Sequence, residues 1–145
     1  MPEKTVEISR FDSALLAIRI GHALDDVRAL YADYPEFMPT FVERALGVNA
    51  TDTTYLAEAL PLFIHDTLYG FEKTNNLVLE TFADMGNIKH DLSRAFTRLA
   101  YLYPDIYVPH IYTFVSGFNA SVLFLEDGDM AVGLDMYLGI DRQDA

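Results

Sequence analysis

The fold of this chain is decided in its last third, where residues 104–139 read PDIYVPHIYTFVSGFNASVLFLEDGDMAVGLDMYLG. Three runs rich in β-branched and aromatic residues, at 111–116, 121–126 and 130–138, are separated by loops of hairpin length. The second loop contains Asp127-Gly128, a pair that tolerates the positive φ of tight hairpin turns. The pattern predicts an antiparallel β-meander, in which each strand pairs with the next one along the chain.

Apolar side chains occur on both faces of these strands, as Tyr112 and Phe114 alternate with Ile111 and Val115. A strand of this kind needs cover on more than one side, so we expect helices to pack on the sheet. The preceding residues supply them, because apolar residues at helical spacing predict helices over 23–32, 36–46, 54–60, 66–82 and 88–101. Alternation over 5–11 favours a short strand or an extended arm.

Punctuating residues set the expected helix ends. Pro61 and Gly70 should interrupt the helical pattern, and Gly47 stands where a left-handed C-terminal cap is expected. The sequence therefore predicts an α+β fold in one domain, residues 1–145. Helices over 12–103 should pack on a small antiparallel β-meander over 104–139, followed by a short tail at 140–145.

Composition narrows the class of partner. The 22 acidic and 10 basic side chains give a formal charge of -12, which would repel a nucleic-acid backbone. The ten Phe and nine Tyr residues suit a packed core, and the absence of cysteine excludes disulfides and thiolate metal sites. No apolar run has the length of a membrane span, and the polar N-terminus lacks the apolar core of a signal peptide, so the sequence as given predicts a soluble chain.

The polar residues show no catalytic pattern. The four histidines lie in separate segments without an HExxH motif, so we predict no metal and no cofactor. Asp66, Glu72, Glu80 and Asp84 fit a solvated helix face. Asp135 interrupts an apolar strand, and because an unpartnered buried carboxylate is costly, it should be either a loop-anchoring acceptor or part of a ligand site.

Several motifs occur in the order and approximate spacing of one known family: FD at 11–12, YPEFMPTFVERALG at 34–47, YLYPD at 101–105, YTFVSGF at 112–118 and AVGLDMYLG at 131–139. In these motifs the chain resembles the gliding-motility lipoprotein GldB family of Bacteroidetes over nearly its whole length. The resemblance implies a cell-envelope protein of the gliding and secretion machinery, with protein partners there and without established enzymatic activity.

The family pattern differs from this chain in two respects. The chain has no lipobox cysteine, and after Asp141 the family continues into a long helical region, so the chain is expected to correspond to the family's N-terminal half. An apolar face or sheet edge left uncovered in this way predicts self-association into a homodimer or larger species.

These observations predict a non-catalytic protein that acts through protein-protein interaction. The strand-rich segment supplies the candidate interaction or ligand residues, which are His110, Tyr112, Phe118, Asn119, Asp135 and Tyr137. One alternative is a degenerate or half-length zincin-like metallohydrolase that lacks its HExxH helix. Another is a small-molecule pocket lined by Tyr112, Phe114, Phe118 and Phe124.

Overall fold

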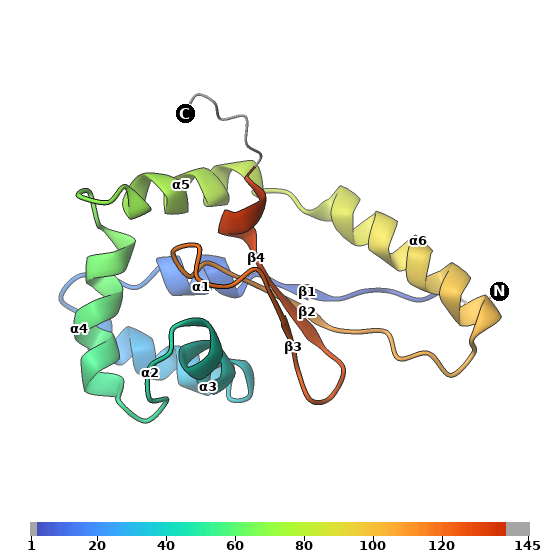
Figure 1. Cartoon of the computed structure of the whole chain (residues 1–145), viewed down its shortest axis with the longest axis horizontal. Coiled ribbons are helices and arrows are strands. Elements are labelled where there is room, and N and C mark those ends of the chain that lie inside the picture. The colour runs from blue at the N-terminus through green and yellow to red at the C-terminus, as the bar shows by residue number, and fades with distance from the viewer. Residues whose placement is uncertain (1–2, 139–145) are drawn as a thin grey trace.

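The computed structural model describes residues 3–138 and confirms the α+β class (Figure 1). A short strand and a run of helices precede the main strands. In chain order the elements are β1 (Ile8–Ser9), α1 (Phe11–Leu16), α2 (Ala23–Asp33), α3 (Phe37–Thr40), the π-helical turn η1 (Phe41–Ala45), α4 (Thr53–Ile64), α5 (Phe71–Thr81), α6 (Gly86–Leu102), β2 (Ile111–Phe114), β3 (Val122–Phe124), β4 (Met130–Gly133) and the 3-10 turn η2 (Leu134–Tyr137).

The sheet is mixed and its strands follow the order β1-β2-β4-β3. β2 runs parallel to β1 on one side and parallel to β4 on the other, with Ile111 opposite Met130 and Phe114 opposite Gly133. β3 pairs antiparallel with β4 through a tight turn, where Gly128 has a φ of +96°. The hairpin predicted around Asp127-Gly128 is thus present, but the antiparallel meander is wrong, because β2 and β3 do not pair.

The loop after β2 explains this difference. Gly117 and Phe118 have φ values of +66° and +65°, and the backbone N–H groups of Ser116 and Phe118 donate to the Asp135 carboxylate. The chain therefore turns away at the end of β2 without starting a ladder with β3. The position beside β2 is then open to β4, whose first residue Met130 donates its N–H to the His110 carbonyl.

The helix predictions succeed over α2 and α6 and need two corrections between them. Pro61 does not end its helix: α4 runs through it, because Leu60 and Ile64 are buried on either side of it and hold the helix against the core. The helix predicted from residue 66 begins only at Phe71, because the Asp66 carboxylate accepts backbone N–H groups from the loop and closes a turn there. Gly47, with a φ of +71°, ends the helical segment as predicted.

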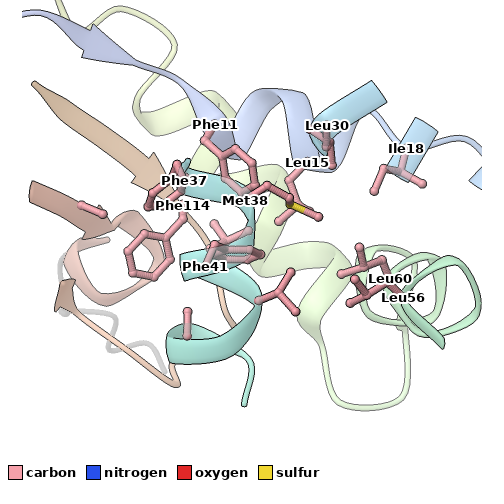
Figure 2. Packing of buried hydrophobic residues seen from close by; sticks show 14 of the residues in the cluster. Phe11, Leu15, Ile18, Leu30, Phe37, Met38, Phe41, Leu56, Leu60 and Phe114 are labelled. Carbon is pink, nitrogen blue, oxygen red and sulfur yellow. The ribbon is translucent and has the colours of Figure 1, made fainter. Parts of the chain in front are cut away.

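The core lies between the sheet and helices α1 to α4 (Figure 2). The Phe11 ring is at its centre, with ring centroids 4.9 Å from both Phe37 and Phe41, and Phe114 of β2 packs against Phe41 at 5.7 Å. α5 adds the buried Val78. α6 buries no residue and lies apart from the other helices (Figure 1).

Candidate interaction site

Asp135 anchors the loop that follows β2. It lies in η2, directly after β4, and only 2% of it is exposed. Its Oδ2 atom accepts the N–H of Phe118 at 2.9 Å and of Ser116 at 3.2 Å, whereas its Oδ1 atom is buried without a hydrogen-bond partner among the described residues. The carboxylate therefore compensates for its burial by fixing the loop conformation.

Two further side chains tie down the same loop, residues 116–120. The Ser116 hydroxyl accepts the N–H of Ala120 at 3.1 Å, and Asn119 donates through Nδ2 to the Ala45 carbonyl of η1 at 2.6 Å. Phe118 lies between Ser116 and Asn119 in the loop and has a left-handed backbone, which a bulky residue rarely adopts. Its side chain is not buried in return, because 49% of the residue is exposed. The loop thus holds an aromatic ring toward solvent in a costly conformation.

Aromatic rings from α4 and α5 lie beside this loop. A Cβ atom at Gly117 would be 3.2 Å from the rings of both Phe63 and Phe71, so the loop backbone sits directly on them. The Phe63 and Phe71 centroids are 5.3 Å apart, and Tyr69, which is 77% exposed, lies 6.5 Å from Phe71. We call Phe63, Tyr69, Phe71, Gly117 and Phe118 the Phe118 patch.

The six residues singled out from the sequence fall into two groups. Phe118, Asn119 and Asp135 meet in the anchored loop, and the half-exposed Tyr137 follows at the same end of the sheet. His110 and Tyr112 lie toward the opposite end of β2. Their rings stack on each other, with centroids 4.6 Å apart, and they do not take part in the Phe118 loop.

At that opposite end, Asp129 holds the chain before β2. It accepts the Tyr107 hydroxyl at 2.5 Å and the His110 N–H at 2.8 Å, while His110 Nε2 lies 2.6 Å from the Ser9 hydroxyl. The hydrogen bond to Asp129 raises the pKa of Tyr107 to about 12, and burial raises the pKa of Tyr112. Sequence reasoning missed Asp129 and Tyr107, although Asp129 follows the Asp-Gly turn that it had identified.

A second buried carboxylate, Asp12, was also missed. Both of its oxygens accept from the Arg10 guanidinium, at 2.8 and 2.9 Å, and Oδ1 also accepts the Thr113 hydroxyl at 2.6 Å. Its side chain is fully buried. These contacts join the start of α1 to the middle of β2, and they make Asp12 a structural link between the two ends of the chain.

The described residues offer little else for chemistry. Within residues 3–138, no three His, Asp or Glu side chains are placed so that they could hold a metal ion. Nor is any helix of this part of the chain both long and apolar enough to cross a membrane.

The family model of the gliding motility protein GldB matches residues 2–144 of this chain. The chain belongs to the GldB family. No curated protein and no solved structure matches it. GldB is a family of gliding-motility lipoproteins, which indicates a place in the cell envelope, and it is not a known enzyme family.

The family motifs can now be placed on the fold of this GldB protein. Residues 112–118 form most of β2 and the first half of the anchored loop, and residues 131–138 form most of β4 and η2. The last motif residue, Gly139, lies outside the described residues. The two motifs are joined by the hydrogen bonds of Asp135, so they make one local structure.

Proposed function

We propose that this GldB-family chain is a non-catalytic component of a gliding-motility assembly in the cell envelope, and that a protein partner docks on the Phe118 patch. The observation that supports this most directly is that the exposed Phe118 ring is carried on a left-handed backbone that a buried carboxylate holds.

The energetics of binding favour such an arrangement. Aromatic side chains dominate the affinity of protein interfaces when they enter a pocket on the partner. A loop whose backbone is already fixed loses little conformational freedom on binding, and hydrogen bonds of Asp135 and Asn119 fix the backbone that carries Phe118. Half-buried Phe63 and Phe71, which lie against the preceding Gly117, add apolar surface next to the loop.

The chemistry of the partner follows from the patch and from the charge of the chain. An apolar pocket should receive the Phe118 ring, and because the chain has a formal charge of -12, basic side chains around that pocket would speed association. We therefore propose an envelope protein with an apolar recess and a basic rim as the partner.

A pair of matched variants tests the proposal. Phe118→Ser removes the ring from the patch, whereas Phe124→Ser removes a more exposed ring, 68% against 49%, from β3 at the edge of the sheet. In cells that depend on this gene for gliding, we expect Phe118→Ser to abolish gliding and Phe124→Ser to preserve it. A photo-crosslinking amino acid should capture an envelope protein from position 118 and not from position 124.

Both proteins should fold, and thermal unfolding checks this. Normal gliding with Phe118→Ser, together with no capture from position 118, would refute the patch as the docking site. The metallohydrolase alternative is separated by elemental analysis and a peptide-cleavage assay on the purified protein: a stoichiometric transition metal with turnover would favour the alternative and contradict a non-catalytic role.

A further inference from the structure

Among the helices of residues 3–138, α6 is the one that buries no residue, and its side chains at positions 89, 93 and 97, which share one face, bind the N-terminal arm. On that face, the Ser93 hydroxyl accepts the N–H of Val6, and the Thr97 hydroxyl accepts the N–H of Lys4, each at 2.9 Å. The N-terminal arm therefore runs along one side of α6. The opposite side of α6 makes no such hydrogen bond to the arm within residues 3–138.

An apolar stripe occupies that opposite side. Its residues are spaced by four, three, four and three positions, the pattern of a coiled-coil seam, and they are Ile88, Leu92, Ala95, Leu99 and Leu102. Ile88 and Leu99 are each more than one-third exposed, and Leu102 is two-thirds exposed. A 17-residue helix with an open apolar stripe is marginally stable in water, so the stripe is expected to pack against another helix.

The stripe is complementary to itself when a second copy lies antiparallel. Seating Leu92 against Ala95 of the second copy places Ile88 against Leu99 of the second copy, and twofold symmetry repeats both layers. Each large side chain then meets another apolar residue across the seam, and the helices stay aligned over four central layers.

Charges beside the seam select the same arrangement. In the antiparallel register, Asp91 of one copy falls beside Arg98 of the other, twice by symmetry. Both side chains are exposed, and neither forms an ion pair with any other residue of the described part of the chain. In a parallel pair, Asp91 would face Phe96 and Arg98 would face Tyr103, so the charges would not meet.

We propose that α6 is a homodimer interface, in which two copies of this chain pair their α6 helices antiparallel, with Asp91 of each copy beside Arg98 of the other. The interface lies on a different element from the Phe118 patch and does not depend on it. Loss of one surface by mutation should leave the other intact.

The apolar part of the interface is tested with two leucines of similar exposure. Leu99→Asp on α6 (37% exposed in the wild type) places two charges in the seam, whereas Leu77→Asp on α5 (45% exposed) lies outside it. By sedimentation equilibrium, wild type and Leu77→Asp should be dimers at about 100 μM. Leu99→Asp should raise the dissociation constant about 100-fold or more, because each dimer loses two buried leucines. Circular dichroism checks that each variant is folded.

The charged part supplies a readout that misfolding cannot imitate. Asp91→Arg and Arg98→Glu should each weaken the homodimer about tenfold or more, since each turns both cross-pairs from attraction into repulsion. An equimolar mixture of the two single variants should form a heterodimer, because every cross-pair is then again a carboxylate and a guanidinium. A monomeric wild type at about 100 μM, or single variants that stay dimeric, would overturn the proposal. So would a mixture that stays monomeric.

Discussion

Removing the Asp135 carboxylate tests whether this single side chain sets the loop that carries Phe118. Asp135→Ala deletes two hydrogen bonds from backbone N–H groups to a charged acceptor. Hydrogen bonds to a charged group contribute about 1.5 to 3 kcal/mol each, so the direct loss is about 3 to 6 kcal/mol. Part of this is offset, because the buried and unpartnered Oδ1 atom disappears and the freed N–H groups can reach water.

We therefore expect Asp135→Ala to lower the free energy of unfolding by about 3 kcal/mol, which for a chain of this size corresponds to a Tm about 6 to 12 °C lower. Urea and thermal unfolding measure the loss. Hydrogen exchange of the Ser116 and Phe118 amides, measured by NMR, locates it, and both amides should lose protection. Asp135→Asn keeps one acceptor oxygen and should cost less, about 1 to 2 kcal/mol.

The matched control is Glu126→Ala, which removes an exposed carboxylate with no hydrogen bond among the described residues. Its effect should stay within about 0.5 kcal/mol. If Asp135→Ala also stays within that margin, or if the two amides remain protected, the loop is held by something other than this carboxylate. The reasoning for a preorganised Phe118 would then fail.

Three further predictions concern close approach and titration. Gly133→Ala should lower the free energy of unfolding, measured with urea, by about 2 to 3 kcal/mol, because a Cβ at position 133 would collide with the backbone carbonyl oxygen of Ala120. The pKa of Tyr107, followed by ultraviolet absorbance, should be about 12, and Asp129→Asn should lower it. The contribution of Tyr107 to stability should be complete below about pH 10 and should be lost as the pH rises from about 10 to 12. The pKa of Asp26, measured by NMR, should be about 2, since the Arg19 side chain donates to this carboxylate, and Arg19→Ala should return the pKa toward 3.8. The contribution of Asp26 to stability should disappear as the pH falls from about 4 to 2.

Local signals accounted for much of the fold. The Asp-Gly pair at 127–128 predicted the β3–β4 hairpin, helical spacing predicted α2 and α6, and Gly47 predicted a helix end. Each of these features depends on residues that are close in sequence, and for that reason a pattern in the sequence could find it.

The strand order could not be found in this way. It depends on Asp135 accepting the Ser116 and Phe118 amides across an intervening hairpin, and a sequence shows no such contact. The cost of burying Asp135 did mark it as a residue that needs partners, and two of its neighbours in the site were among the candidates. Asp12 gave no such signal, since its partner Thr113 lies 101 positions away.

For α6, periodicity showed the amphipathic face but could not show what covers it. The helix was expected to pack on the sheet because most amphipathic helices of a small domain do so. It instead stands beyond the core, where two hydroxyls attach it to the N-terminal arm.

The pairing of β1 with β2 imposes an order of events on folding. Ile8 meets Ile111, so β1 cannot pair until a strand 103 positions further along the chain has been made. Contacts of such long sequence separation close large loops and slow the search for the native state. The helices can form as the chain emerges, but the sheet must wait for β4, which lies between β2 and β3. A nascent chain arrested before residue 130 should therefore be helical, without a closed sheet, and easily cleaved by proteases.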